Sequence, residues 1–289
     1  MSEVDLIVPD PLPDGALVHY VLPDSVPGLS LEIRDATGRT VQRWGPGERG
    51  RELPFGAGFH RVAWDLRYAT GGVKAPPGDY VVHLSWDGGE QERPLRVVPD
   101  PMDPDLTRAD YDEQFRVSMA VADTQAAVNA AVRRIRSVRQ QADSLLAWAR
   151  DGGRDAARLT ELHRALLAPL AELEARLTST DRTDGPAGKR TIAGLDRQYG
   201  ALLNHLNSGG GYGPGSTEGR PTAGALMRQR ELDAAWSGLA AQLAQVESLE
   251  LAAFNAEVER LRGAGVLPPR GEAEGPRSGS GGALEWAPA

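Results

Sequence analysis

The chain of 289 residues contains no cysteine, and aromatic residues make up only 6% of it. The lack of thiols excludes a disulfide framework, a thiolate metal site and a cysteine nucleophile. Apolar runs long enough to cross a bilayer are missing, so we expect no membrane span. The net charge of −8 argues against a nucleic-acid partner, because such partners require clustered positive charge.

The first fifteen residues are acidic and proline-rich, and they lack the basic and apolar regions of a signal peptide. We therefore expect no signal peptide in this chain and, by default, a cytoplasmic location. The compartment itself stays open, since exported proteins without cysteine are common.

Short runs of alternating apolar and polar residues occupy the first 98 positions. In one run, alternate positions hold His60, Val62, Trp64 and Leu66, whose side chains would point to the same side of a strand. In a second run, alternate positions hold Tyr80, Val82, Leu84 and Trp86. Period-two alternation is typical of half-buried strands, and large inward side chains fill the space between packed sheets. Six or seven such runs in about ninety residues predict an immunoglobulin-like β-sandwich over residues 1–98, with Trp64 and Trp86 in its core.

Turn residues separate these runs. Asp35-Ala-Thr-Gly38 predicts a hairpin turn in which Gly38 adopts a positive φ, and Asp87-Gly88-Gly89 predicts another. Pro94 lies in the strand that follows the second turn and favours an edge position for that strand, because proline cannot donate a ladder hydrogen bond.

Three prolines between residues 98 and 105 predict a linker over 99–106. Thr107-Arg-Ala-Asp110 then resembles a capping box, with Asp110 in place of the usual glutamate. We predict helices over about 108–150, 154–179, 190–207 and 222–263, from apolar residues recurring at three- and four-residue steps. The last predicted helix is unbroken and has Ala253 in its apolar seam. The second predicted helix carries a leucine seam, formed by Leu159, Leu162, Leu166, Leu170, Leu173 and Leu177.

Each predicted helix would leave an apolar stripe exposed to water if it stood alone. We therefore predict an elongated antiparallel helical bundle over 107–265, in which the second and third helices together form a broken middle leg. The whole chain is thus expected to be a multidomain β-plus-α protein. The glycine-, proline- and serine-rich segment 266–289 is predicted to be a disordered tail.

Residue patterns that could carry chemistry are weak. The five histidines have no ligand-motif spacing, and the interhelical segment 208–215 lacks the Gly-Lys-Ser/Thr ending of a phosphate-binding loop. Asp100, Asp103 and Asp105 could hold calcium, but they fit solvated linker charges better. Four arginines of the first helix (Arg133, Arg134, Arg136 and Arg139) fit a solvated face with some carboxylate pairing. We predict no catalytic, cofactor-binding or metal-binding residue, and no cofactor.

Several segments together resemble the C-terminal region of bacterial sortilin-like proteins with Asp-box (BNR) repeats, which are often labelled glycosyl hydrolases. The matching segments are PDGALVHYVL, LEIRDATGRTVQ, GFHRVAWDLRY, APPGDYVVHL, LDRQYGALLNHL and AAFNAEVERL. In that family a β-propeller precedes a sandwich module and a helical tail, and the full-length proteins are usually exported. The immunoglobulin-like module of flagellar hook-capping proteins is also similar. Asp-box motifs of the propeller do not occur in this sequence, so the resemblance implies no catalytic residue here.

These observations favour a non-catalytic accessory protein that mediates protein–protein or domain–domain contacts, with a β-propeller as a candidate partner. The surface expected for such contacts comprises the excursion from Tyr68 to Lys74, the loop around Tyr212, and Trp44. Two alternatives stay open. One is a subunit or fragment of a glycoside hydrolase. The other is a carbohydrate-binding module in which Trp44, Trp64 or Trp86 provides a stacking platform.

Overall fold

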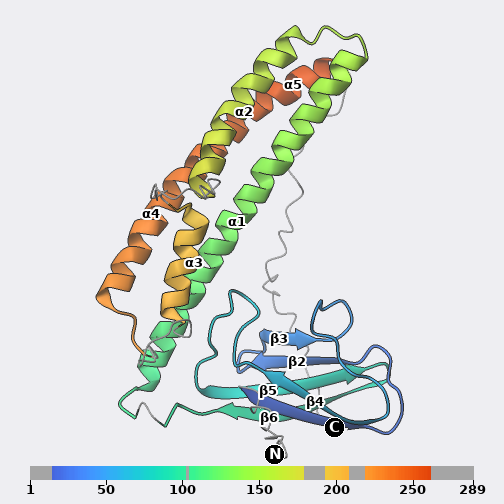
Figure 1. Ribbon diagram of the computed structural model, residues 1–289, viewed down its shortest axis with the longest axis vertical. Helices are drawn as coiled ribbons and strands as arrows, with labels where there is room; N and C mark the ends of the chain where they lie inside the picture. The colour runs from blue at the N-terminus through green and yellow to red at the C-terminus, as the bar shows by residue number, and fades with distance from the viewer. Residues whose placement is uncertain (1–14, 102–103, 179–192, 208–218, 262–289) are drawn as a thin grey trace, which may run out of the picture. The chain divides into compact units, whose positions relative to one another are not determined.

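The computed structural model describes residues 15–101, 104–178, 193–207 and 219–261, which form antiparallel sheets followed by helices (Figure 1). The chain divides into two compact units. One comprises Met1–Ala127 and Leu195–Ala235, and the other comprises Val128–Gly194 and Trp236–Ala289. The helices within the described ranges are all too short or too polar to span a membrane.

Six strands lie in the first unit and form two antiparallel sheets. They are β1 (Ala16–Leu22), β2 (Ser30–Asp35), β3 (Thr40–Trp44), β4 (Gly58–Trp64), β5 (Gly78–Trp86) and β6 (Gly89–Val97). One sheet pairs β1 with β4, and the other has the order β3-β2-β5-β6. Pro94 lies on the edge strand β6, as the sequence predicts.

The predicted turns are confirmed. Asp35 Oδ1 accepts hydrogen bonds from the backbone N–H groups of Thr37 and Arg39, and Gly38 has a φ of 83°. An aspartate side chain that binds the following backbone in this way stabilises a tight turn. At the β5–β6 connection, Trp86 pairs directly with Gly89, so the hairpin loop is two residues long.

Aromatic side chains connect the two sheets. The fully buried Trp64 of β4 contacts Tyr80 of β5 in an edge-to-face arrangement, with ring centroids 5.3 Å apart. The indole Nε1–H of Trp64 donates to the carbonyl of Arg67 at 2.9 Å, which satisfies the polar group of a buried ring. The predicted inward parity of β4 is therefore confirmed.

The inward parity predicted for β5 is wrong at its end. Trp86 is 36% exposed, whereas His83 of the opposite parity is buried. Trp86 is the last residue of its strand, where its ring lies over Gly89 instead of entering the core. His83 is covered on the other face of the sheet, where it pairs in register with Glu32 and Glu92 and its Nε2 lies 3.0 Å from Glu90 Oε2.

A small hairpin at residues 66–75 connects β4 to β5. The amide of Ala75 donates to the carbonyl of Leu66 and that of Tyr68 donates to the carbonyl of Val73, each at 2.7 Å. The Arg67 guanidinium donates to the Gly72 carbonyl, which holds the tip in place. This excursion is therefore an ordered hairpin, referred to below as the 66–75 hairpin.

Helix α1 (Arg108–Asp151) begins with the predicted capping box. The backbone N–H of Thr107 donates to the Asp110 carboxylate, and the Asp110 N–H donates to the Thr107 hydroxyl. The Thr107 bonds, with Arg220 nearby, lower the pKa of Asp110. Reciprocal bonds of this kind satisfy backbone donors that the first helical turn leaves open.

The first unit also contains α3 (Leu195–Leu206) and the first part of α4 (Ala223–Val246). The buried Gln114 of α1 donates to the Leu206 carbonyl at 2.7 Å, and its Oε1 accepts from the backbone of Gly219. The hydroxyl of Tyr199 on α3 donates to Asp233 on α4 at 2.7 Å. Burial, together with this bond, raises the pKa of Tyr199.

The second unit contains the rest of α1, α2 (Ala157–Leu177), the end of α4, a π-helical turn η1 (Glu247–Leu251) and α5 (Ala252–Arg260). Helix α2 lies beside α5 (Figure 1). The predicted leucine seam of α2 is buried, apart from the half-exposed Leu162. The predicted carboxylate pairing of the α1 arginines is confirmed, since Arg136 and Arg139 both bind Glu174 and Arg134 binds Glu247.

The last helix departs from its predicted form. A single helix with Ala253 in its apolar seam was expected, but Ala253 is exposed and Phe254 and Val258 are fully buried. The cause is η1, which adds one residue to a turn and moves the buried positions one step along the chain. The third helix begins at Leu195, later than the predicted 190. Residues 190–192 and the predicted tail 266–289 lie outside the described ranges.

Candidate functional site

Two residues predicted to form a contact surface lie in the interior. Tyr68 is only 3% exposed, its ring lies 4.9 Å from that of Phe115 on α1, and its hydroxyl donates to Asp35. Burial, followed by the nearby charges of Tyr80 and Asp35, raises the pKa of Tyr68. Trp44 is buried in the sheet core. Neither ring is available to a partner, because each already packs against other parts of the first unit.

The remaining two predicted contact residues have different outcomes. Lys74 is partly exposed, and its backbone N–H donates to Asn207 Oδ1 across 3.5 Å. Asn207 also donates to the Gly72 carbonyl. The 66–75 hairpin therefore docks onto the end of α3 as well as onto α1. Tyr212 lies outside the described residues, as does Asp103 of the candidate calcium cluster.

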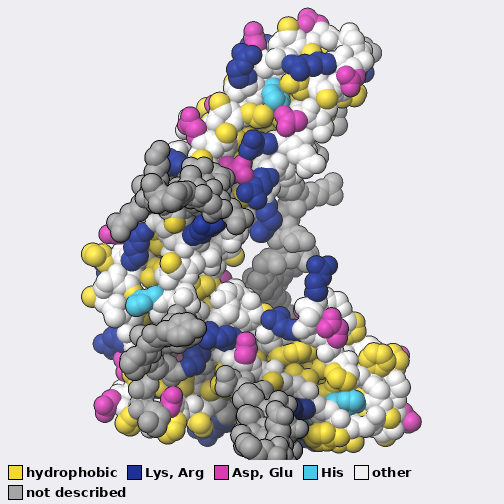
Figure 2. All heavy atoms as spheres, viewed as in Figure 1, with side chains coloured by type: hydrophobic (Ala, Val, Ile, Leu, Met, Phe, Trp, Pro, Cys, Tyr) yellow, Lys and Arg dark blue, Asp and Glu magenta, His cyan; other side chains and the backbone are white. Residues whose placement is uncertain are grey.

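An apolar surface that the sequence reasoning missed lies on the outer face of the β1–β4 sheet. Val21 and Phe59 are paired in register across the two strands and are 68% and 67% exposed. The ring of His19 stacks on that of Phe59 with centroids 5.2 Å apart. Figure 2 shows hydrophobic side chains on the surface over the sheets. We call Val21, Phe59 and His19 the β1–β4 face. Its signal in the sequence is that Val21 and Phe59 are apolar although they occupy strand positions whose side chains point away from the core.

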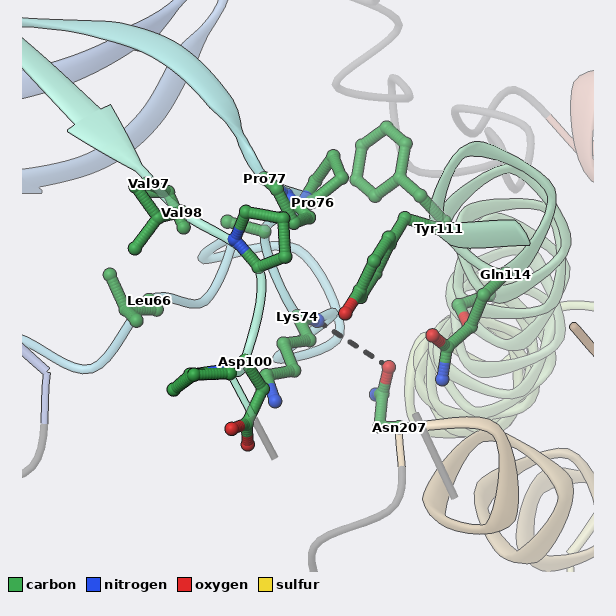
Figure 3. Close-up of a pocket in the computed structure, with 15 residues that line it drawn as sticks. Leu66, Lys74, Pro76, Pro77, Val97, Val98, Asp100, Tyr111, Gln114 and Asn207 are labelled. Carbon is green, nitrogen blue, oxygen red and sulfur yellow. Dashed lines mark hydrogen bonds between the residues drawn. The ribbon is translucent and has the colours of Figure 1, made fainter. Parts of the chain in front are cut away.

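A pocket lies within the first unit, between the 66–75 hairpin with the two prolines that follow it, the segment after β6, and the first turns of α1 (Figure 3). Its volume is about 280 Å³. Tyr111, Gln114, Phe115 and Ser118 line it from α1 at helical spacing, so they share one helix face. In Figure 3, Tyr111 and Gln114 lie across the cavity from Pro76 and Pro77.

The polar groups of this pocket differ in what they bind. Both ends of the Gln114 amide hydrogen-bond to backbone, and both ends of the Asn207 amide bind the 66–75 hairpin. Ser118 is 1% exposed, and its hydroxyl has no hydrogen-bond partner in the described part of the chain. A serine within a helix commonly binds the carbonyl four residues earlier, so this arrangement is unusual.

Backbone conformation at the pocket wall is also unusual. Leu66 has a φ of 57°, in the left-handed region that side chains other than glycine rarely adopt. The hydrogen bond from the Ala75 N–H holds it there. Such outliers cluster at ligand sites and switch regions.

Two charged side chains, Lys74 and Asp100, also line the pocket, and Tyr80 lies beside it. The Tyr80 hydroxyl donates to the Pro76 carbonyl at 2.7 Å, and burial raises the pKa of Tyr80 to about 12. The described histidines contact separate partners, for example His163 with Asp143. Over the described ranges, three or more histidine or carboxylate side chains do not gather in a way that could hold a metal ion.

Comparisons with family models, curated proteins and solved structures find no match to the chain.

Proposed function

We propose that this chain is a non-catalytic accessory protein that holds a protein partner, with the two sheets arranged as an immunoglobulin-like sandwich and the helices as an antiparallel bundle. The β1–β4 face supports this proposal best. Two large apolar side chains lie side by side there in water, and burying them against a partner would be favourable by roughly 25 cal/mol per Å² of apolar surface.

The strands beneath this face add a second reason. In the part of the chain that the structure describes, β1 and β4 pair only with each other, so each presents one edge of backbone N–H and C=O groups. A partner strand could extend this sheet, and the apolar face would then continue across the added strand. The likeness to sortilin-like proteins suggests a β-propeller as the partner, since a propeller precedes the corresponding region in that family.

The experiment is isothermal titration of the full chain with a purified propeller domain of a sortilin-like protein. We expect saturable binding that is weakened at least about tenfold by the double change Val21→Ser and Phe59→Ser. The control is Met227→Ser, which removes a comparably exposed apolar side chain from α4. Equal binding by the double variant and the control would rule out the β1–β4 face.

A carbohydrate-binding function is the second candidate, and it now depends on Trp86. Trp44 and Trp64 are buried, whereas Trp86 is partly exposed and its ring is supported from beneath by Gly89. A supported, exposed indole is the kind of platform on which sugar rings stack. Binding on a glycan array that disappears with Trp86→Ala would favour this function over protein binding.

The glycoside hydrolase alternative requires turnover by the chain itself. Two carboxyl groups on either side of a bound sugar would be needed for it. A substrate screen with the purified chain tests this alternative, because an accessory protein would show no turnover without its catalytic partner.

A further inference from the structure

We infer that the pocket of Figure 3 is a binding site for a compact aromatic group carrying a single hydrogen-bonding atom, which the Ser118 hydroxyl recognises. This inference is independent of the proposed protein-binding face, because the pocket and the β1–β4 face share no residue.

The size of the pocket selects the size of the group. A cavity of about 150 Å³ can take up one benzene ring. The pocket here, at about 280 Å³, therefore suits one or two fused rings but not a larger ligand.

The walls favour a flat, apolar group. Prolines line the pocket from two separate segments, namely Pro76 and Pro77 before β5 and Pro99 and Pro101 after β6. Proline has a fixed φ and no backbone N–H, so these parts of the wall are rigid and offer no backbone donor. The charged side chains of Lys74 and Asp100 also line the pocket, and each already interacts with another group of the described chain. The rings of Tyr111 and Phe115 lie on the α1 side, where they can contact an aromatic guest edge to face.

Ser118 sets the polar requirement. Its hydroxyl is buried and without a hydrogen-bond partner in the described residues, whereas the amides of Gln114 and Asn207 are already bound to backbone. A buried polar group without a partner is costly, and a guest that supplies one recovers that cost. A hydroxyl can donate or accept, so the guest needs one N–H, O–H or acceptor atom.

Two sources share this chemistry: a free aromatic molecule such as indole, and the tryptophan side chain of a partner protein. The test is isothermal titration of the full chain with indole and, separately, with N-acetyl-tryptophanamide. Binding of indole alone assigns the site to a free small molecule, and binding of both assigns it to a partner's side chain. Absence of saturable one-to-one binding by either probe overturns the inference.

Two variants place the site. Val98 is 68% exposed at the pocket, so Val98→Trp should fold normally and block entry, weakening binding more than tenfold.

Ser118→Ala should weaken binding of indole about fivefold, the loss of one hydrogen bond, and should leave binding of 1-methylindole unchanged. Met227→Trp, at an exposed position of α4 outside the pocket, is the matched control and should bind as the unaltered chain does. Undiminished binding in both Val98→Trp and Ser118→Ala would overturn the assignment.

Discussion

Gly71 lies at the tip of the 66–75 hairpin, where the backbone touches α1. Its φ is 64°, and a Cβ at this position would lie 2.6 Å from the Cβ of Ala122. Gly72 beside it has nearly the same φ, 62°, but a Cβ there would meet no atom within 4 Å. An alanine at Gly72 would therefore meet only the cost of a positive φ, whereas an alanine at Gly71 would meet the same cost and a steric clash as well.

Gly71→Ala is expected to destabilise the protein more than Gly72→Ala. Both changes should cost about 1 kcal/mol for placing alanine at positive φ. Gly71→Ala should cost roughly 1–3 kcal/mol more, since the Ala122 Cβ cannot move aside. Urea unfolding of the two variants measures the difference, and equal free energies of unfolding would contradict the observed docking of the tip on α1.

Glu174 is a nearly buried carboxylate between two arginines. Burial raises the pKa of Glu174, but the hydrogen bonds from Arg136 and Arg139 lower it by more than burial raises it. The folded-state pKa of Glu174 therefore lies below the usual value. A group with a lowered folded-state pKa adds stability above its unfolded pKa, and this stability is lost as the pH falls through the folded pKa.

Glu174→Gln should therefore lower the free energy of unfolding at pH 7 by roughly 1–2 kcal/mol, as expected for hydrogen bonds to a charged group. The difference from the unaltered chain should shrink as the pH falls below about 4, where glutamate in the unfolded chain is protonated. Thermal unfolding as a function of pH measures it. Glu172→Gln, an exposed change on the same helix, is the control, and a similar pH dependence there would contradict a specific role for Glu174.

At the scale of elements, the π-helical turn η1 keeps the last helix in phase. Val246 and Leu251 are buried and five residues apart, a spacing that an α-helix would place on different faces. Farther along, Phe254 and Val258 return to α-helical spacing. One additional residue in η1 therefore explains why both segments bury the same side.

Deletion of the exposed Ser248 is expected to convert η1 into ordinary α-helix while Leu251, Phe254 and Val258 stay buried. Stability should remain within about 1 kcal/mol of the unaltered chain, because no core contact is lost. Deletion of Ala244, equally exposed but within α4, should rotate the following core residues outward and cost at least about 3 kcal/mol. Guanidinium unfolding distinguishes the two, and equal loss of stability would refute this account of η1.

The sequence predicted local features well and long-range contacts poorly. The turn at Asp35–Gly38, the capping box at Thr107 and the leucine seam of α2 depend on neighbouring residues, and all were predictable. The burial of Tyr68 depends on Phe115, almost fifty residues away, so its aromatic ring looked like an exposed contact residue. The pocket likewise joins segments far apart in the chain, and Ser118 alone carries no sequence signal. The π-helical turn η1 was not predicted, because a 3.6-residue period describes an unbroken α-helix and takes no account of an inserted residue.

At the scale of the whole molecule, the two compact units interleave along the chain. Helices α1 and α4 each pass from one unit into the other, between residues 127 and 128 and between 235 and 236. The unit that contains the sheets is therefore incomplete without residues 195–235.

A fragment of residues 1–106 should consequently be less stable than the sheets within the full chain. It lacks Phe115, Ala122 and Asn207, which cover the 66–75 hairpin, and loss of one aromatic partner alone costs roughly 3–5 kcal/mol. Near-ultraviolet circular dichroism should show weakened aromatic signals that return when a fragment of residues 107–261 is added. Full native signals in the isolated fragment would show that the sheets fold alone.

The interleaved units also have a consequence during synthesis on the ribosome. The strands leave the exit tunnel first, yet the segment that completes their unit, 195–235, ends 108 residues after Ala127 (235 − 127). At roughly 5–20 residues per second, translation of that stretch takes about 5–20 s. During this interval the 66–75 hairpin lacks its hydrogen bonds to Asn207, and Gln114 lacks the Leu206 carbonyl. The sheet-containing unit can therefore complete its native packing only after most of the chain has been synthesised.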